Sequence, residues 1–168
     1  MRGIFRAIST AGFLSVAAAT AFAQPKLVES FNDWAFYSHQ SPNERICFVA
    51  SAPKSSDPAG GRRDSAFFYI SAWPREGVRT ELSVKAGYPF RKGSEVTVTI
   101  GNETFKLITH EERAFVNDPI EELKLLEAMK KGSTMIVEGV SQRGTVTKDT
   151  FSLLGVSKAV ATLAAQCN

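Results

Sequence analysis

The sequence has few of the residues that most often hold metals or act as nucleophiles. Two histidines and two cysteines occur in 168 residues. His39 and His110 lie about 70 positions apart, so a metal site would need carboxylates gathered by the fold, and no spacing indicates this. Residues 110–114 (HEERA) begin like the H-E-x-x-H of zinc proteases, but Ala114 stands where the second histidine belongs. We expect no metal and no other cofactor.

Common catalytic motifs are also missing. The chain contains neither the G-x-S-x-G of hydrolases nor a phosphate-binding loop. Cys47 could act as a nucleophile beside His110, but its expected pairing with Cys167 would block the sulfur. Glu121 and Glu122 fit the start of a helix better than an acid/base pair. We therefore predict that the protein is not an enzyme, with an enzyme of unrecognised site as the alternative.

Long hydrophobic runs are confined to the first 23 residues. Arg2 and Arg6 precede an uncharged, alanine-rich stretch over residues 7–22, and residues 21–23 (AFA) form an A-x-A cleavage signal. This pattern predicts a cleaved signal peptide over residues 1–23 and a mature single domain over residues 24–168. A retained membrane anchor is the alternative, although the run is short for a span. The expected location is periplasmic or secreted, with no transmembrane span after cleavage.

Excess positive charge is largely absent from the mature chain. The twenty Lys and Arg residues fall by two to 18 when the leader leaves, against 17 Asp and Glu. Nucleic-acid binding therefore has little electrostatic basis. The local pair Arg62 and Arg63, between glycines and Asp64, is typical of a solvated loop.

Only two cysteines are available for a crosslink. An exported chain meets an oxidising compartment, where such a pair usually bridges. We predict a disulfide between Cys47 and Cys167, with two buried free thiols as the alternative.

Strand-like alternation of apolar and polar residues dominates the mature chain. The clearest case is a hairpin over residues 94–107 with a Gly101–Asn102 turn, whereas residues 53–64 have loop composition. Short turns between strands favour antiparallel pairing. The fold class is mainly β, an antiparallel β-sandwich or a curved, barrel-like sheet with one helix between strands and a C-terminal helix. Further strands are expected near residues 33–37, 45–50, 66–73, 78–85, 134–140 and 144–153.

Two helices complete the pattern. Asp118, Pro119 and Glu121 form the start signal of the first, which ends before Gly132. Its apolar stripe is expected at Ile120, Leu123, Leu126 and Met129. The second begins near Ser157 and carries Val156, Val160, Leu163 and Cys167 on one face.

The stretch SQRGTVTKDTFSLLG, residues 141–155, is dense in hydroxyl and charged side chains. Its strict alternation predicts the polar face of a strand. Lys148 and Asp149 would then face opposite ways and could not act on the same atom of a substrate.

Several aromatic residues are candidates for a recognition patch. Most rings are expected in the core, and Trp73, at a strand end before Pro74, is the best surface candidate. The predicted interaction patch comprises Trp73, Arg75, Tyr69 and Arg143. The wider aromatic set is Trp34, Tyr37, Tyr69, Trp73, Tyr88 and Phe90.

The order of several segments resembles one protein family. The segments FNDWAFY, GYPF, VTVTIGNETFKL, residues 128–155 and the terminal KAVATLAAQC are similar to the invasion-associated locus B family of Gram-negative bacteria. The resemblance implies an exported β-rich domain, linked to host-cell entry in pathogenic members, with no catalytic residues to carry over. Many members have a cysteine where Tyr37 stands here, and further cysteines in mid-chain.

These observations lead to one leading function and one main alternative. We expect an exported, non-catalytic interaction domain that contacts another envelope or host protein, and no nucleic acid. The alternative is a periplasmic module that binds a small ligand.

Overall fold

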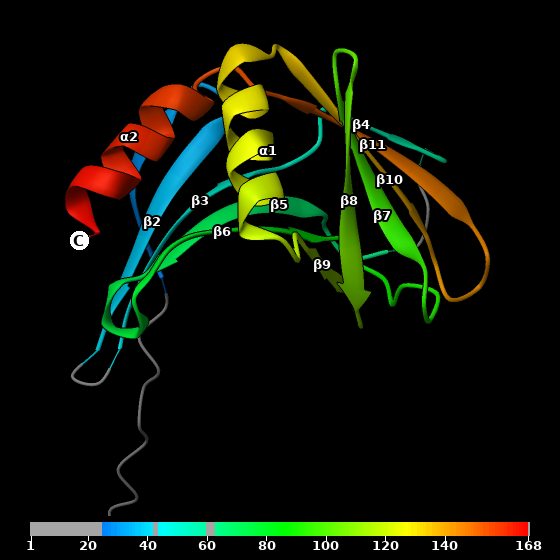
Figure 1. The fold of residues 1–168 in the computed structure, drawn as a ribbon, viewed down its shortest axis with the longest axis horizontal. Helices are drawn as coiled ribbons and strands as arrows, with labels where there is room; N and C mark the ends of the chain where they lie inside the picture. Colours follow the sequence, from blue (N-terminus) through cyan, green and yellow to red (C-terminus); the bar gives the residue numbers. More distant parts are fainter. Residues whose placement is uncertain (1–24, 42–43, 60–62, 168) are drawn as a thin grey trace, which may run out of the picture.

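The computed structural model describes residues 25–41, 44–59 and 63–167. The predicted signal peptide lies outside these residues. The described chain forms eleven strands, two α-helices and one short 3-10 helix (Figure 1). The strands are β1 Lys26–Phe31, β2 Trp34–Gln40, β3 Arg45–Ser51, β4 Ser55–Asp57, β5 Phe67–Trp73, β6 Val78–Lys85, β7 Glu95–Ile100, β8 Glu103–His110, β9 Arg113–Phe115, β10 Thr134–Val140 and β11 Val146–Ser152; the helices are η1 Pro74–Glu76, α1 Pro119–Lys131 and α2 Val156–Gln166.

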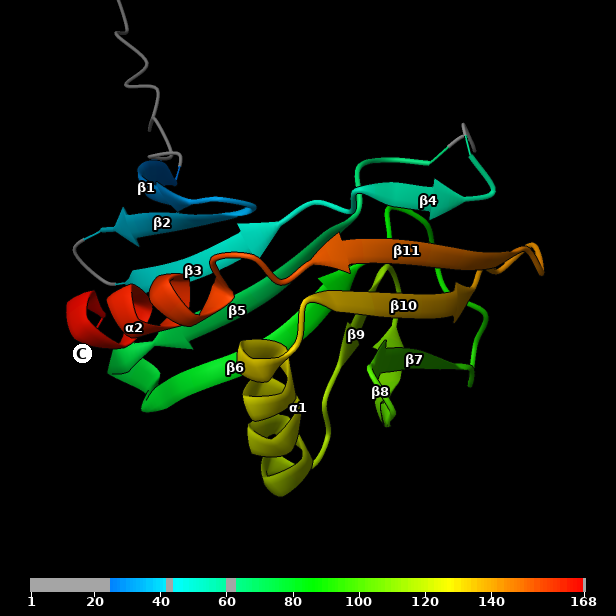
Figure 2. The same ribbon diagram turned by 90° about the horizontal axis from the view of Figure 1, so that it is seen from above.

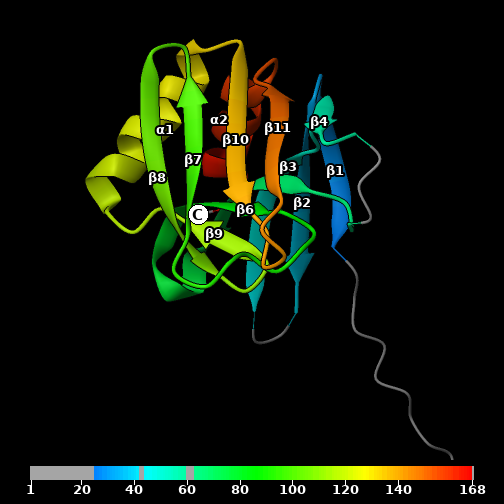
Figure 3. The ribbon, with the colours of Figure 1, turned by 90° about the vertical axis from the view of Figure 1, so that its right-hand side faces the viewer.

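All eleven strands belong to one antiparallel sheet in the order β1-β2-β3-β5-β6-β9-β8-β7-β10-β11-β4. The prediction of a mainly β fold is confirmed. Of the two predicted architectures, the curved sheet rather than the β-sandwich describes the molecule, because all strands belong to one continuous sheet. Figure 3 shows β8, β7, β10 and β11 side by side. The edge strands are β1 and β4, so the sheet is open.

The sheet curls until distant strands face each other. Phe68 on β5 and Phe151 on β11 make an edge-to-face ring contact with centroids 6.2 Å apart, although these strands are fourth and tenth in the order. Residues 52–54 carry the chain from β3 directly into β4, and the amide of Lys54 donates to the carbonyl of Thr150 at 2.7 Å. The chain therefore nearly closes the curve beside β11.

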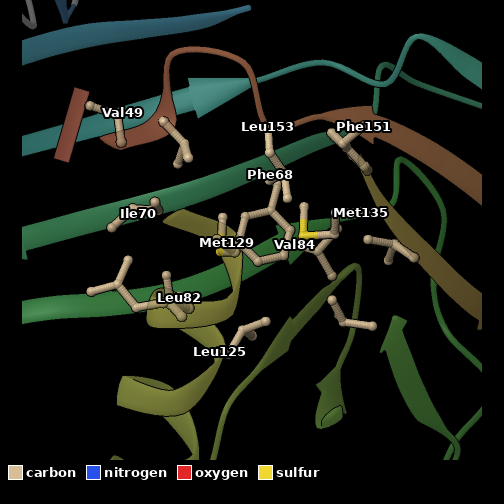
Figure 4. Close-up of a cluster of buried hydrophobic side chains, with 14 of the residues drawn as sticks. Val49, Phe68, Ile70, Leu82, Val84, Leu125, Met129, Met135, Phe151 and Leu153 are labelled. Carbon is tan, nitrogen blue, oxygen red and sulfur yellow. The ribbon is translucent and has the colours of Figure 1, made fainter. Parts of the chain in front are cut away.

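The inner face of the curled sheet holds the hydrophobic core. Residues that alternate along each strand point inward, as a pleated strand requires, and both helices cover this side (Figures 1 and 2). Figure 4 shows side chains from the sheet and α1 meeting in one cluster. Its labelled members are Val49, Phe68, Ile70, Leu82, Val84, Leu125, Met129, Met135, Phe151 and Leu153.

Helix α1 begins and ends where the sequence predicted, but it buries a different face. The Asp118 carboxylate accepts hydrogen bonds from the amides of Ile120 and Glu121 at 2.8 and 3.0 Å, as an N-cap does. The predicted stripe is wrong at its start: Ile120 is 65% exposed and Leu123 62% exposed. The buried residues are Leu125, Leu126, Ala128 and Met129.

Helix α2 packs on β1, β2 and β3 through Val156, Ala159 and Leu163. Cys167, directly after the helix, is bonded to Cys47 on the inner face of β3. The predicted disulfide is therefore present, and it ties the C-terminal helix to the middle of the sheet.

Three strands were not predicted from the sequence. Residues 24–32 were treated as a lead-in but contain β1, the loop predicted over residues 53–64 contains β4, and no strand was predicted at β9. β4 reads Ser-Ser-Asp and has no strand pattern of its own. It is a strand because it pairs with β11 from Lys148 to Thr150.

Candidate functional site

The outer face of β2, β3 and β5 carries a row of aromatic side chains. They alternate with core residues such as Phe36 and Val49, and so point away from the core. Tyr37 and Phe48 stack with ring centroids 5.0 Å apart, and Phe48 meets Tyr69 edge-on at 5.8 Å. Phe67 joins Tyr69 at 5.9 Å. We call Tyr37, Phe48, Phe67 and Tyr69 the aromatic row.

A cation borders the aromatic row. The Arg113 guanidinium lies over the Tyr69 ring at 5.3 Å from its centroid, within cation–π range. Burial raises the pKa of the Tyr69 phenol, and the charge of Arg113 partly opposes this shift. The four rings are half-buried, because they pack on each other while one side of each stays open to solvent. Since α1 and α2 both bury their apolar sides in the core, neither described helix covers this row.

The predicted patch residues fall into two places. Tyr69 and Trp73 lie on the outer face of β5, about 13 Å apart for four residues of strand. Arg75 follows in η1 and is exposed. Arg143 instead lies in the β10–β11 turn, at the opposite end of the molecule from the β5–β6 connection (Figure 2). The structure thus places Tyr69 and Trp73 on β5 and Arg75 directly after it in η1, and it separates Arg143 from all three.

The remaining aromatic candidates lie either in the core or beside a second region of the surface. Trp34 and Phe90 are core residues, whereas Tyr37, Tyr69, Trp73 and Tyr88 are half-buried, so the expectation that most of these rings lie in the core is wrong. The indole nitrogen of Trp34 donates to the carbonyl of Ser152 at 3.0 Å. Tyr88 is half-buried in a second region, described next.

A polar cluster near the β4 end of the sheet was missed by the sequence. Arg63 and Asp149 form an ion pair whose side chains are only 14% and 3% exposed. Arg63 Nη1 donates to Asp149 Oδ2 at 2.9 Å and to the carbonyl of Ala86 at 3.2 Å, and the Ser56 hydroxyl donates to Asp149 Oδ1 at 2.6 Å. The hydrogen bonds to Asp149 raise the pKa of Arg63. The solvated-loop interpretation of Arg63 is therefore wrong, while Arg62 lies outside the described residues.

One signal in the sequence did point to this pair. Thr147 and Asp149 are in phase with Phe151, a core residue, so strict alternation places all three on the inner side. The polar-face interpretation of residues 141–155 holds for Lys148, which is exposed, but the inner face also carries buried Thr147 and Asp149. A buried carboxylate needs a cationic partner. Nothing in the sequence identified Arg63 as that partner among 20 basic residues.

A cleft lies beside the ion pair, between the β6–β7 connection and the β10–β11 turn. Its volume is about 440 Å³. Tyr88 stands in its wall, with its phenol oxygen 2.5 Å from the Thr147 hydroxyl and its ring 5.8 Å from the Arg63 guanidinium carbon. We call this hollow the Tyr88 cleft. Its lining residues are Pro58, Arg63, Gly87, Tyr88, Pro89, Ser141, Gln142, Arg143, Thr145 and Thr147.

Within the described ranges, no group of three or more His, Cys, Asp or Glu side chains is placed to hold a metal ion. His110 and Arg113 pair across the short β8–β9 connection, so HEERA comprises the end of β8, a two-residue turn and the start of β9 rather than a helix. No helix in the described part of the chain is long and apolar enough to cross a membrane.

The sequence model of the Invasion associated locus B (IalB) protein family matches residues 34–164, from the start of β2 into α2. The chain belongs to the IalB family. In structure it is similar to invasion associated protein B from Bartonella henselae, whose crystal structure aligns with a TM-score of 0.58 and 13% sequence identity. The alignment covers 83% of this IalB-family chain and 96% of the Bartonella chain.

At this level of identity the Bartonella structure supports the IalB fold alone. No curated protein matches the chain in sequence. The aromatic row and the Tyr88 cleft must therefore be interpreted from their own chemistry.

Proposed function

We propose that this IalB-family protein is an exported, non-catalytic interaction domain of the bacterial envelope, and that the outer face of β2, β3 and β5 binds a protein partner. The observation that carries the proposal is the aromatic row of Tyr37, Phe48, Phe67 and Tyr69, half-open to solvent beside Arg113. Rings of this kind offer large contact area at small cost in side-chain entropy, and they are enriched at the centres of interfaces.

The chemistry of the face indicates what a partner would present. An apolar side chain can pack on Phe48 and Tyr69, and a carboxylate can pair with Arg113 at the border. Trp73, further along the same face of β5, extends the contact toward η1. We infer that the partner is another envelope protein. The family name links its members to invasion, so a host protein is the alternative partner.

The disulfide supports the proposed export to an oxidising compartment. The Cys47–Cys167 disulfide is stable in the periplasm or outside the cell, and such bonds are rare in the cytosol. The predicted signal peptide over residues 1–23 leads to the same compartment.

Photocrosslinking in living cells tests the proposal. A photoreactive amino acid is placed at Phe48 or Tyr69 on the outer face, and at Thr104, an exposed residue of β8, as the matched control. We expect one discrete protein adduct from the outer-face positions, its loss on Trp73→Ala, and no such adduct from Thr104. The mass of the adduct distinguishes an envelope protein from a host protein.

Two results would overturn the proposal. One is no adduct from either outer-face position; the other is the same adducts from Thr104 as from Tyr69. Circular dichroism of Trp73→Ala establishes that a lost adduct does not reflect unfolding.

A further inference from the structure

The Tyr88 cleft is a second feature of the molecule, separate from the aromatic row. Its lining includes Ser141, Gln142, Arg143 and Thr145 of the β10–β11 turn. That turn lies at the opposite end of the molecule from the β5–β6 connection (Figure 2). Its volume of about 440 Å³ falls in the range of small-molecule sites, about 300–1,000 Å³. The cleft is therefore large enough for a ligand the size of a monosaccharide derivative.

The charge of the lining favours an anion. Arg63 and Arg143 line the cleft, and no Asp or Glu is among its lining residues. The charge of Arg63 is compensated by Asp149 behind it. Arg143 is exposed, and no ion pair joins it to another residue of the described chain. Arg143 thus leaves an uncompensated positive charge at the rim.

A second cation stands near the same turn. A Cβ built on Gly144 would lie 2.8 Å from Arg91 Nη2, so the Arg91 side chain extends along the turn that carries Arg143. Two guanidinium groups near one turn attract carboxylate or phosphate, for which guanidinium geometry is well suited.

Part of the cleft lining is apolar. The Tyr88 ring is held by three contacts: its hydroxyl with Thr147, its face with Arg63, and an edge contact with Phe90 at 5.3 Å. Burial raises the pKa of the Tyr88 phenol, so the hydroxyl stays protonated at neutral pH. With Pro58 and Pro89, this ring offers a surface for a sugar ring or an aliphatic body.

The walls are fixed to each other by backbone hydrogen bonds. The amide of Gln142 donates a hydrogen bond to the carbonyl of Pro89 at 2.8 Å. The amide of Arg91 donates a hydrogen bond to the carbonyl of Val140 at 2.9 Å. The amide of Thr145 donates to the Ser141 hydroxyl at 3.1 Å, which holds the turn. A site held this firmly loses little entropy on binding.

We propose that the Tyr88 cleft binds a small organic anion, with its carboxylate or phosphate at Arg143 and its ring against Tyr88. Ser141, Gln142 and Thr145 line the cleft and offer hydrogen bonds to hydroxyl groups of the ligand. This site shares no residue with the aromatic row.

NMR titration of the mature protein tests the proposal with three probes of similar size: glucose 6-phosphate, glucuronate and uncharged glucose. We expect saturable shifts at the amides of residues 87–88 and 142–145 with one or both anions, and none with glucose. The first two probes distinguish phosphate from carboxylate as the preferred group. Arg143→Gln is expected to weaken binding at least about tenfold, because it removes a charged hydrogen bond to the anion.

Arg79→Gln is the matched control, because Arg79 is an exposed arginine of β6 that does not line the cleft. It removes the same charge and is expected to leave affinity unchanged. Equal loss of affinity in the two variants, or no saturable shift at the cleft amides with either anion, would overturn the proposal. Thermal unfolding of Arg143→Gln checks that the turn is intact. Crosslinking from Tyr69 in the same variant is expected to be unchanged, so the two proposals fail separately.

Discussion

The curled sheet is fastened at two places by different chemistry. Near α2, a covalent bond joins Cys167 to Cys47 on β3. Near β4, a buried ion pair joins Arg63, in the segment before β5, to Asp149 on β11. The disulfide attaches the end of α2 to the inner face of β3, and the ion pair attaches the segment before β5 to the inner face of β11. Reductant or substitution of a cysteine breaks the disulfide, whereas reductant leaves the ion pair intact and only substitution of Arg63 or Asp149 removes it.

Removal of the disulfide is expected to have the largest effect. In the chain-entropy model, a bond between residues 120 apart stabilises the fold by about 5 kcal/mol. Urea unfolding of Cys47→Ala/Cys167→Ala should show that loss, and wild type with reductant should match it. Equal urea midpoints for variant and oxidised wild type would mean that packing of α2 is sufficient without the bond.

Breaking the ion pair from one side is expected to have the second largest effect. Asp149→Asn leaves the buried Arg63 charge uncompensated, which costs about 3–5 kcal/mol in comparable sites. Reductant should not reproduce this loss. The double variant Arg63→Met/Asp149→Leu should recover most of the stability, because an apolar pair of similar volume needs no desolvation of charge. A double variant less stable than Asp149→Asn would contradict the ion-pair interpretation.

Substitution of Gly87, which lies beside the Arg63 segment, is expected to reduce stability by a smaller amount, and Gly77 provides the matched control. Gly87 has φ +74°, and a Cβ there would overlap the backbone of Asp64, whose amide donates to the Gly87 carbonyl at 3.0 Å. Gly77 has φ +76° with open space around it. Gly77→Ala should cost about 1 kcal/mol from backbone strain alone. Gly87→Ala should cost at least about 2 kcal/mol, since the Arg63 segment must also move. Thermal unfolding of both variants measures the difference, and equal losses would exclude the close approach.

The smallest expected effect concerns α1, which is held to β6 by a carboxylate. Glu122 Oε1 accepts from the Leu82 amide at 2.5 Å. Burial raises the pKa of Glu122 and of nearby Glu81, and the charge of Glu122 raises that of Glu81 further. Between the ordinary and the raised pKa, the folded state keeps protons that the unfolded chain has released. Stability therefore falls as pH rises through this window.

Glu122→Gln should flatten that fall while retaining an acceptor for Leu82. Urea unfolding between pH 4 and 7 checks this expectation. A variant with the same pH slope as wild type would show that Glu122 does not contribute to it.

The comparison of the two fastenings also shows what the sequence could predict. The disulfide was predictable because only two cysteines exist. The ion pair was not, because Arg63 and Asp149 are 86 positions apart among many charged residues, and only the fold brings them together. The same holds for the Tyr88 cleft, whose walls come from segments about 50 residues apart.

Local sequence signals predicted the bounds of helices and strands better than they predicted which side chains are buried. The bounds of α1 followed from Asp118, Pro119 and the basic last turn. The buried face of α1 could not be predicted from its sequence, because apolar residues lie on more than one side of the helix. Packing against the sheet buries Leu125 and leaves Ile120 exposed. β4 was missed because pairing with β11, rather than propensity, makes it a strand. The aromatic row was not predicted, because most rings were expected in the core and only the packing of the sheet shows which face of β2, β3 and β5 stays open.

The bond between Cys47 and Cys167 has a topological consequence. It makes a single covalent ring of most of the described chain. A protease that cuts once between these two residues opens the ring but releases no fragment. The nicked molecule keeps its full mass until the disulfide is reduced, so a single cut does not separate Phe48, Phe67 and Tyr69 of the aromatic row from the Tyr88 cleft.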